Sequence, residues 1–475
     1  MANGTQLLVR HEARSPQGQD ALQHYAKAVG AMKERDPSDP RSWDYQAAIH
    51  GTESSPLSLQ RQCEHESWFF FPWHRIYLYY FEEIVREAVV DTGGPADWTL
   101  PYWNYDLGGE FASLPEPFRQ PADEGENPLY VGVRRPYYNA GGPLPELIST
   151  EEAALALREF IGNAMFGGNN KSPHRPRFWG QSGLPEETPH GTVHVQLGGW
   201  MRNPEEAAWD PIFWLHHANI DRIWAVWNEK EGLPNPTEGG WTEHVFEFFD
   251  AEGNKAKRTC GEVTETALLG YTYDPPPGGG SVEEVTPTST EPPEPEAGAP
   301  TEPKFVGATE QPTILEGDSA EVPLEIEEKG QGEVMEAAEA GDPRHLYLNF
   351  EEIRGDSTPD TVYATYLNLP EDPSPADFDS RYITTLSFFG LERTTDPVDD
   401  EAPHGMRVSS EVTEIVRRLR DETDWDRSRL SVCFRPVVPE PTAEMPEEAR
   451  ELLESSHRPE HDPIAIGRIS LSIDA

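Results

Sequence analysis

Cysteine and long apolar runs are both scarce in this 475-residue chain. The three cysteines, Cys63, Cys260 and Cys433, are widely spaced and odd in number, which excludes a disulfide framework and leaves at least one thiol unpaired or otherwise used. No stretch approaches the roughly 18 to 20 apolar residues of a membrane-spanning helix. The opening residues MANGTQLLVRHEARS lack the apolar run of a secretory signal. We therefore expect a cytoplasmic protein with no membrane partner.

Positive charge is also in short supply. Lysine and arginine number 38 against 85 aspartates and glutamates, which gives a formal net charge of −47. Such a chain would repel nucleic acids and anionic membranes, so neither is expected as a partner. The excess acid is spread along the whole sequence. It fits either adaptation to high salt, where surface carboxylates are screened, or a bias of composition joined to an acidic linker.

Composition divides the chain into three parts, in keeping with the roughly two to four domains that its length favours. Residues 1–273 are rich in tryptophan, phenylalanine and histidine, show helical periodicity and hold every candidate metal ligand. Residues 274–302 are rich in proline, glutamate and glycine and have no large apolar residue to bury, which predicts a linker. Residues 303–475 carry short alternating runs between turn-forming residues.

The third part is predicted to be an antiparallel β-sandwich. One helix is expected within it, from Ser410 to about Arg420, because valine, isoleucine and leucine recur there at helical spacing. The strand-like runs are HLYLNFEEI, TVYATYLNL, YITTLSFFG, RLSVCFRPV and AIGRISLSI.

The first part is predicted to be a mainly α-helical domain, a four-helix bundle with a metal site in its core. Proline at the first helical position marks helix starts at Pro72, Pro189 and Pro211, and Asp210 supplies an N-cap for the last of them. Helix ends are marked by glycines, at Gly51, Gly93 and Gly94.

Six histidines form two groups of three, and each group can offer neutral imidazoles to one metal ion with coordination positions left open. Imidazole suits copper, zinc, iron or nickel, so these ligands alone do not name the metal. They do predict a paired catalytic metal site. The first group is His50, His65 and His74, and the second is His190, His194 and His217.

Spacing explains how the second group can converge. His190 and His194 are four residues apart, so on a helix they share one face, with Cβ atoms about 5 to 6 Å apart. In DPIFWLHHANID the adjacent His216 and His217 point about 100° apart around a helix, so one of them is expected to face the metal. We favour His217, because Asp221 four residues on can accept the proton of its far ring nitrogen. His216 is then a packed or supporting residue.

The first group needs a break in the helix. His65 and His74 are nine residues apart and would lie on opposite faces of one straight helix, but Pro72 starts a new helix and leaves His65 in the preceding segment. Cys63 lies two residues before His65. Taken alone, it is most simply interpreted as a buried thiol with no chemical role.

Four segments together resemble the copper-binding segments of the tyrosinase, catechol oxidase and haemocyanin family of binuclear copper proteins. They stand in the family's order and spacing, and the similarity covers nearly all of residues 7–273. The resemblance implies that the two histidine groups hold two copper ions with dioxygen between them. It also implies that Cys63, in the arrangement Cys-Glu-His, forms a thioether to the ring of His65. The segments are HESWFFFPWHRIYLYYFE, LPYWNYD, PHGTVHVQLGGW and DPIFWLHHANIDRIW.

The resemblance continues beyond the linker. LGYTYD, with Tyr271 and Tyr273, resembles the motif that closes the family's catalytic domain, and TVYATYLNLPED through PIAIGRISLSID is similar to the carboxy-terminal domain of plant-type polyphenol oxidases. In those proteins this domain covers the copper site, and its removal can activate the enzyme. Two interpretations stay open for this chain: a removable cover, as in a zymogen, and a permanently docked stabilising domain.

The resemblance also implies a base for the substrate. A phenol has an unperturbed pKa near 10, so at neutral pH something must take its proton before it binds copper as phenolate. Glu186, four residues before His190, matches the family's glutamate that holds a water near the second copper. Glu187 is the alternative if the register slips by one residue.

Three further residues near the second copper bear on the activity. Gly191 stands where many strong monophenol hydroxylases of the family carry an asparagine that helps to orient this water, and glycine offers no such side chain. Val195, after His194, adds no charge to attract a substrate carboxylate. Phe213, one turn before His217, is expected either to pack above the second copper or simply to fill the core.

We therefore expect an oxidoreductase that converts o-diphenols to o-quinones with dioxygen, with hydroxylation of monophenols in doubt. Small, uncharged or weakly charged catechols are expected to be favoured. The alternative is a reversible dioxygen carrier of haemocyanin type. Three features argue against it: one copper unit in the chain, no secretion signal, and a linker suited to a detachable cover.

Overall fold

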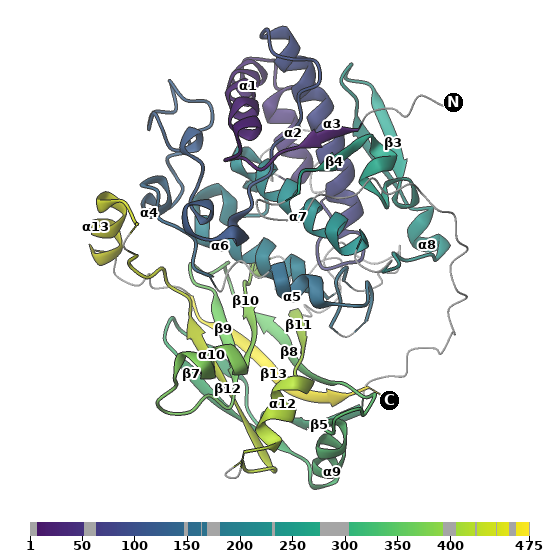
Figure 1. Ribbon diagram of the computed structural model, residues 1–475, viewed down its shortest axis with the longest axis vertical. Coiled ribbons are helices and arrows are strands. Elements are labelled where there is room, and N and C mark those ends of the chain that lie inside the picture. The colour runs from purple at the N-terminus through teal and green to yellow at the C-terminus, as the bar shows by residue number, and fades with distance from the viewer. Residues whose placement is uncertain are drawn as a thin grey trace.

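The computed structural model describes residues 7–51, 63–146, 151–162, 164–168, 181–229, 233–275, 304–392, 405–422, 425–442, 444–455 and 462–474. A helical part occupies one end of the molecule and a β part the other (Figure 1). The predicted linker, 274–302, lies outside the described residues except for its first two.

The helical part is built around helices that carry a wide buried face. The longest, α3, buries 16 of its 22 residues and packs against both α1 and α7. The main helices are α1 (Pro16–Lys33), α2 (Trp43–His50), α3 (Phe70–Asp91), α6 (Thr192–Leu197) and α7 (Ile212–Glu229). Shorter ones are α4 (Pro136–Asn139), α5 (Glu151–Ala156) and α8 (Gly239–Thr242).

The predicted helix boundaries fall close to the observed ones. Helix α2 ends at His50 with Gly51 as its cap, and α7 begins directly after Pro211, where the Asp210 carboxylate accepts the N–H of Ile212 at 3.1 Å. Helix α3 begins two residues before Pro72. The largest departure is at Pro189, which lies inside a single π-helical turn, Glu186–Gly191, that leads into α6.

Two short strand pairs complete the helical part. Strand β1 (Leu8–Arg10) pairs in parallel with β4 (Tyr271–Tyr273), so the two ends of this part lie side by side. Strands β2 (Val245–Phe249) and β3 (Lys255–Thr259) form an antiparallel hairpin.

The β part is one antiparallel sheet of nine strands. Eight follow the order β10-β9-β12-β7-β5-β13-β8-β11, and β6 pairs with β13 beside this path. The edge strands β10 and β11 approach each other, so the sheet is curled nearly into a barrel. The strands are β5 (Lys304–Ala308), β6 (Thr313–Leu315), β7 (Ala320–Ile326), β8 (Leu346–Arg354), β9 (Tyr363–Leu367), β10 (Tyr382–Leu386), β11 (Met406–Glu411), β12 (Arg429–Pro436) and β13 (Ile464–Ile473).

Helices flank this sheet. The one expected from Ser410 is α12, and it begins three residues later because β11 runs on to Glu411. The helices of the β part are α9 (Glu328–Ala337), α10 (Pro375–Arg381), α12 (Thr413–Arg420) and α13 (Glu447–Ser455).

The two parts pack directly on one another. The apolar core of the helical part continues into residues of the β part, among them Val362, Phe389 and Val437, while the sheet has a second core of its own. Strand β10 lies against the π-helical turn that holds His190. A separate arm of the β part carries α13 up to α4, at the left of Figure 1.

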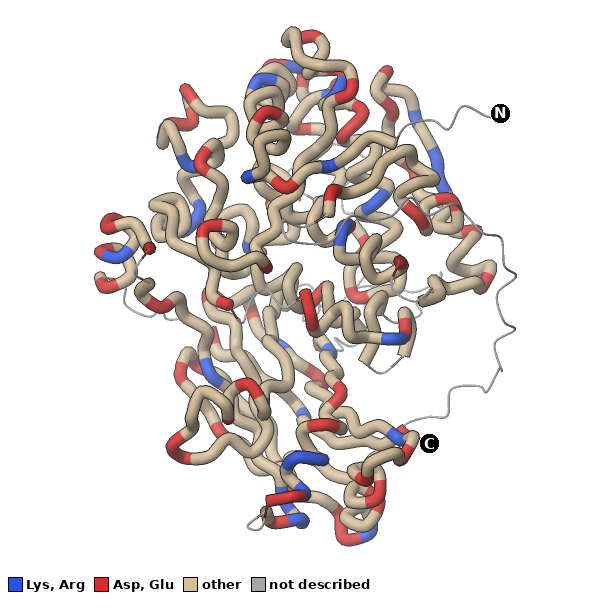
Figure 2. Tube along the Cα trace, in the orientation of Figure 1, with Lys and Arg blue, Asp and Glu red and all other residues tan. Residues whose placement is uncertain are grey.

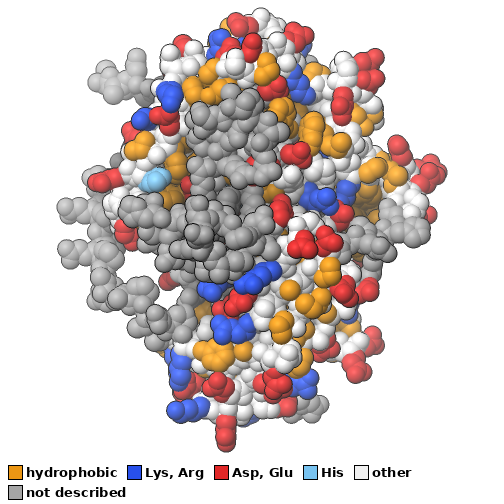
Figure 3. All heavy atoms as spheres, turned by 180° about the vertical axis from the view of Figure 1, so that it is seen from behind, with side chains coloured by type: hydrophobic (Ala, Val, Ile, Leu, Met, Phe, Trp, Pro, Cys, Tyr) orange, Lys and Arg blue, Asp and Glu red, His pale blue; other side chains and the backbone are white. Residues whose placement is uncertain are grey.

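Acidic residues are distributed over both parts, as Figure 2 shows along the chain and Figure 3 shows for the opposite face. The charge is therefore not confined to one binding surface. Among the described residues, no helix is long and apolar enough to cross a membrane.

Candidate metal centre

The two predicted histidine groups meet in the core of the helical part. The first comes from the end of α2, the segment before α3, and α3 itself; the second comes from the π-helical turn, α6 and α7. The rings of His74 and His217 stack with centroids 4.5 Å apart and planes 12° apart, so the groups are in contact. The possible ligand atoms of His50, His65 and His74 all lie within 4.8 Å of one another.

Main-chain carbonyl groups fix the orientation of four of these rings. Each of the four donates its Nδ1–H to a carbonyl oxygen, which leaves Nε2 as the atom with a lone pair for a metal. The Nε2 atoms of His74 and His190 are buried and have no hydrogen-bond partner among the described residues. The bonds run from His50 to Pro204 (2.9 Å), from His74 to Phe70 (2.8 Å), from His190 to Glu186 (2.9 Å) and from His194 to Met201 (2.7 Å).

Burial keeps these imidazoles neutral. It lowers the pKa of His190 to about 3, although the hydrogen bond to the Glu186 carbonyl opposes the shift. Burial first, and neighbouring imidazoles second, hold the pKa values of His74, His194 and His217 well below their usual range. Neutral imidazole is the form that binds a metal ion, so the donor set fits two metal ions of the kind that nitrogen ligands prefer.

His216 lies in the second group as well, because the possible ligand atoms of His190, His194, His216 and His217 are mutually within 4.8 Å. The two adjacent histidines differ in what they face. Nε2 of His217 lies 3.3 Å from Nε2 of His194, and its ring stacks on His74 of the first group. Nδ1 of His216 lies 3.2 Å from the hydroxyl of Tyr105. His217 therefore joins the two groups, whereas His216 is engaged by a tyrosine.

The prediction that Asp221 accepts the far ring proton of His217 is wrong. Nδ1 of His217 has no hydrogen-bond partner among the described residues. The carboxylate of Asp221 is instead taken by two arginines and two tyrosines, and it ties the β1–β4 pair and α3 to α7. The donors are Arg75 (2.5 Å), Arg10 (3.2 Å), and the hydroxyls of Tyr271 and Tyr273 (each 2.6 Å).

Phe213 and Cys63 both lie in the core. The Phe213 ring contacts His217 and His50 with centroids 4.1 and 4.8 Å away, so it packs on ligands from both groups. Cys63 is fully buried and carries no disulfide bond. The thioether to His65 stays a prediction.

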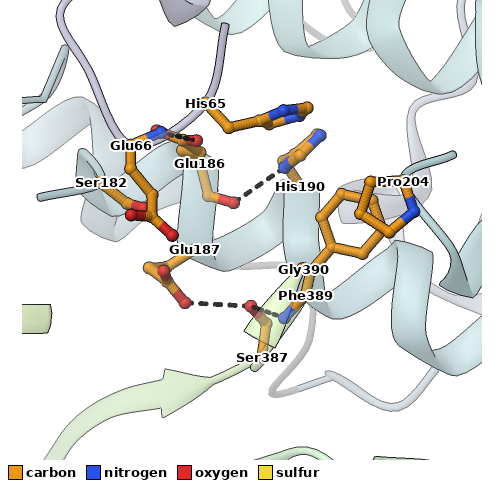
Figure 4. Close-up of a pocket in the computed structure, with 10 residues that line it drawn as sticks. All are labelled: His65, Glu66, Ser182, Glu186, Glu187, His190, Pro204, Ser387, Phe389 and Gly390. Carbon is orange, nitrogen blue, oxygen red and sulfur yellow. Dashed lines mark hydrogen bonds between the residues drawn. The ribbon is translucent and has the colours of Figure 1, made fainter. Parts of the chain in front are cut away.

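Glu186 and Glu187 are both buried, and both line one pocket with His65 and His190 (Figure 4). Glu186 accepts the main-chain N–H of Glu66 at 2.6 Å. Glu187 accepts the hydroxyl of Ser387 at 2.9 Å. Burial raises the pKa of Glu187, and its hydrogen bonds to serine hydroxyls oppose that rise.

A turn of the β part, Ser387–Gly390, enters this pocket beside the histidines (Figure 4). The ring of Phe389 lies nearly parallel to that of His194, with centroids 4.3 Å apart and planes 18° apart. The same ring is 5.4 Å from His190 and 5.9 Å from His65. Phe389 therefore contacts histidines of both groups.

Gly191 lies directly against this turn, and Val195 lies four residues further on, in α6. A Cβ atom on Gly191 would come within 2.3 Å of Ser387 Oγ and 3.2 Å of Phe389 Cβ, so the turn fits only against glycine. The side chain of Val195 is buried, and its carbonyl oxygen accepts a bond from Arg135 at 3.1 Å.

Several residues of the site were not predicted from the sequence. Phe389 and Ser387 belong to a run that alternates like an ordinary strand, and nothing local places that run near residues 186–194. Met201 and Pro204 act through main-chain carbonyls, which no side-chain pattern reveals. Tyr105 lies in LPYWNYD, a segment whose resemblance was noted, but its bond to His216 has no signal in the spacing.

Comparisons with known proteins give this geometry a family context. A family model described as the common central domain of tyrosinase matches residues 40–143 and 144–230, and one described as a domain of unknown function matches residues 302–473. Tyrosinase HcTyr1 of Hahella sp. (strain CCB-MM4) is 32% identical over 453 residues, which is 88% of this chain and 93% of that protein. The chloroplastic polyphenol oxidase of Malus domestica is 30% identical over 285 residues, 52% of this chain but only 45% of that protein.

Solved structures share the whole architecture. Latent apple tyrosinase matches with a TM-score of 0.63 at 23% identity, over 99% of this chain and 98% of that one. Latent aurone synthase from its natural source matches with a TM-score of 0.64 at 19% identity, over 99% and 90%. At these identities the similarity is one of fold. It confirms the predicted fold class, a mainly helical part followed by an antiparallel β part.

Proposed function

The chain belongs to the tyrosinase family, whose members oxidise phenols with copper and dioxygen, and we propose that within this activity it converts catechols to o-quinones in preference to hydroxylating monophenols. Its relatives are tyrosinases and polyphenol oxidases, so the protein is an oxidoreductase and the reversible oxygen carrier is not favoured. The preference for catechols, the ligand assignment and the role of the β part are the proposals developed below.

The observation that carries the proposal is the pair of buried imidazole groups in contact, four of whose rings have Nδ1 bound to a carbonyl. Two copper ions held by these groups would supply the site where dioxygen takes electrons from the phenol. In the overall reaction two catechols lose two electrons and two protons each, and one dioxygen becomes two waters. We assign His50, His65 and His74 to the first copper, and His190, His194 and His217 to the second.

His217 rather than His216 is assigned because of what each ring faces. The His217 ring contacts ligands of both groups, while Nδ1 of His216 faces the Tyr105 hydroxyl. The test is metal content. His217→Asn should lower the bound copper from two ions to one per chain, whereas His216→Asn should keep two. If His216→Asn lowers the copper content and His217→Asn does not, His216 is the ligand and His217 is not.

Glu186 is proposed to hold the water that takes the phenolic proton. Its carboxylate lies in the pocket that also contains His65 and His190, and one oxygen is fixed by the Glu66 N–H. Glu187, the alternative, is engaged by Ser387 of the β part in the docked state. Gly191 provides no side chain to orient this water. Removing two electrons from a catechol demands less of the base than hydroxylating a monophenol, so catechol oxidation is the step this site supports.

The full chain is further proposed to be latent. Phe389 stacks on His194 and occupies the approach to both groups. Two hydrogen bonds fix its turn and strand to the π-helical segment: Ser387 to Glu187, and Thr188 to the carbonyl of Thr385 at 2.9 Å. A substrate can reach the histidines only when this turn moves.

The function is tested by assaying the copper-loaded protein on a catechol and on its matching monophenol, with oxygen consumption and quinone absorbance followed together. Both should rise with the catechol, and the monophenol should give a much lower rate. The assay is repeated with Phe389→Ala, which opens the approach and should raise catechol turnover. Reversible oxygen uptake without quinone formation would contradict the proposal, as would equal rates on the two substrates.

A further inference from the structure

The docked β part shows where an aromatic ring is accommodated. Phe389 lies almost parallel to His194 at 4.3 Å, within 6 Å of one ligand from each group. Such offset stacking is a favourable arrangement of two rings. A substrate ring that reaches the metal centre can use the same face of His194 once Phe389 has left.

A second side chain of the β part is seated on two arginines. Asp360, in the loop between β8 and β9, accepts a hydrogen bond from Arg202 through its carboxylate and one from Arg135 through its main-chain oxygen. The Asp360 carboxylate also lies 3.5 Å from the Arg135 guanidinium. Within the part of the chain that the structure describes, Arg135 and Arg202 each form an ion pair with Asp360 and with no other acid.

Both arginines lie beside His194. Arg135 donates to the carbonyl of Val195, the next residue, at 3.1 Å. Arg202 follows Met201, whose carbonyl accepts the Nδ1–H of His194 at 2.7 Å. The cationic pair is thus connected to the ring on which Phe389 stacks.

Asp360 and Phe389 also belong to one face of the β part. The loop that carries Asp360 is bonded to the loop beyond Phe389 through the Thr358 hydroxyl and the Glu392 carboxylate, at 2.5 Å. When the β part docks, an aromatic ring and a carboxylate therefore arrive together, the ring on His194 and the carboxylate on the two arginines.

Asp360 brings two arginines together in a chain with 85 acidic and only 38 basic residues. Loss of Asp360 would leave two partly exposed guanidinium groups without this carboxylate. A guanidinium presents paired N–H donors that match the two oxygens of a carboxylate. In the docked state both arginines approach one oxygen of the Asp360 carboxylate, and without Asp360 their donors are left for a ligand.

We propose that Arg135 and Arg202 bind the carboxylate of a phenolic acid substrate whose ring stacks on His194, and that Phe389 and Asp360 occupy these two places in the docked state. The substrate class is a catechol bearing a carboxylate on a short side chain. The proposal rests on the proposed oxidase function and specifies its substrate. It also replaces the expectation that uncharged catechols are favoured. That expectation rested on Val195, which carries no charge, whereas Arg135 and Arg202 supply the positive charge that a substrate carboxylate needs.

The test uses the full, copper-loaded chain with Phe389→Ala, so that the ring place is vacant. The substrates are 3-(3,4-dihydroxyphenyl)propanoate and its methyl ester, which differ at the carboxyl group by the negative charge and one methyl group. Adding Asp360→Asn should raise the ratio of kcat/KM for acid over ester about threefold to fivefold, the size expected for a partly exposed ion pair. Adding Arg202→Gln to that double variant should bring the ratio back down.

A charge control and a binding measurement complete the test. Lys257→Gln, on the exposed β2–β3 hairpin, removes one positive charge elsewhere and should leave the ratio unchanged. Calorimetry with the unreactive pair 3-phenylpropanoate and 3-phenylpropanamide should show a preference for the acid that Arg202→Gln removes.

The outcomes separate the two proposals. If the ester is oxidised but Asp360→Asn and Arg202→Gln leave the ratio unmoved, the carboxylate site is overturned while the oxidase stands. If Lys257→Gln lowers the ratio as much as Arg202→Gln, the effect is general charge attraction and the site is again overturned. If neither substrate is oxidised, the oxidase function itself fails.

Discussion

Single residues in this centre are positioned by the main chain more than by other side chains. The Nδ1 atoms of four histidines are held by carbonyls of residues 70, 186, 201 and 204, so each ring orientation depends on backbone that is itself fixed by packing. The sequence could offer all six rings as candidates because the histidines are visible in it, and so is the proline that separates His65 from His74. It could not identify their anchors, since any residue has a carbonyl group. Asp221 was misassigned for the same reason: a carboxylate at i+4 was visible, but the four donors that take it were distant in sequence.

Cys63 carries the clearest chemical prediction at this scale. Its sulfur should form a thioether to the ring of His65 when the copper-loaded protein is exposed to dioxygen, with loss of two hydrogens as oxygen is reduced. An intact-mass measurement should show this loss in the holoprotein. Cys63→Ala should abolish it, and Cys260→Ala, which removes another buried thiol, should not. If the mass of the copper-loaded parent protein is unchanged, the predicted thioether does not form.

Gly191 allows the turn of the β part to dock closely. An alanine Cβ there would meet Ser387 Oγ at 2.3 Å, and relieving such an overlap costs about 1–3 kcal/mol. We expect Gly191→Ala to shift the turn out of the pocket and to raise catechol turnover of the full chain about tenfold. Oxygen consumption is the measurement. Gly240→Ala in α8 is the matched control, because a Cβ there meets nothing within 4 Å. Turnover no higher than that of the control would show that the turn accommodates the methyl group.

At the scale of helices and strands, the sequence predicts correctly those helix boundaries that depend on residues within one turn of the helix end. The Asp210 cap and the Gly51 stop were predicted because capping uses residues within one turn. The π-helical turn at 186–191 was not, since its form depends on contacts with β10 and α7. In the β part, strand β11 is not among the predicted strands, and its last two residues fall in the helix predicted from Ser410, because MRVSSEV alternates only weakly.

The turn that covers the centre shows how an element can be held in an unfavourable conformation. Phe388 has a φ of 58°, a value that costs a non-glycine residue about 1–3 kcal/mol, and it is kept there by its neighbours Ser387 and Phe389. Burial of the Phe389 side chain against the helical part stabilises the docked turn by roughly 1.5–3 kcal/mol. The docked turn is therefore stabilised mainly by its contacts with the helical part, which suits the proposal that it leaves when the site opens.

The network around Asp221 should make a pH-dependent contribution to the stability of the helical part. Burial alone would raise the pKa of Asp221, but Arg75, Arg10 and the two tyrosine hydroxyls lower it below its usual value. A carboxyl whose folded pKa is depressed stabilises the fold above its unfolded pKa, near 3.9, and loses that contribution as the pH falls through the folded value.

We therefore expect Asp221→Asn to destabilise the protein at pH 7 by about 3–5 kcal/mol, because the buried Arg75 loses the carboxylate it pairs with, while Arg10 keeps Glu82. Its penalty should shrink below about pH 4. The melting temperature of wild type and variant is compared at pH 7 and pH 3. Asp97→Asn, an exposed acid of the same part, is the control and should change little. An equal penalty at both pH values would contradict the linkage.

Across the whole molecule, function depends on residues about 200 positions apart. The proposed metal ligands lie between residues 50 and 217, and Asp360 and Phe389 of the β part contact the helical part near them. Composition could separate a helical part from a β part because each has its own periodicity. It could not show which edge of the sheet docks, since that is set by the match between Gly191 and Ser387, between Glu187 and Ser387, and between Asp360 and its arginines.

The cover has more than one attachment, which decides what cutting the linker should do. Thr385 and Asp360 contact the helical part near the centre, and the arm with α13 packs on α4 at a separate place. No lysine or arginine lies between Arg258 and Lys304, so a glutamate-specific protease can cut the 274–302 segment where trypsin finds no site. We expect the two fragments to elute together in size-exclusion chromatography after this cut, with little gain in catechol turnover. Moderate denaturant should then separate them and raise turnover sharply. Immediate separation on cutting would show that the linker, rather than these contacts, holds the cover in place; separation without any gain in turnover would show that Phe389 does not limit access to the metal centre.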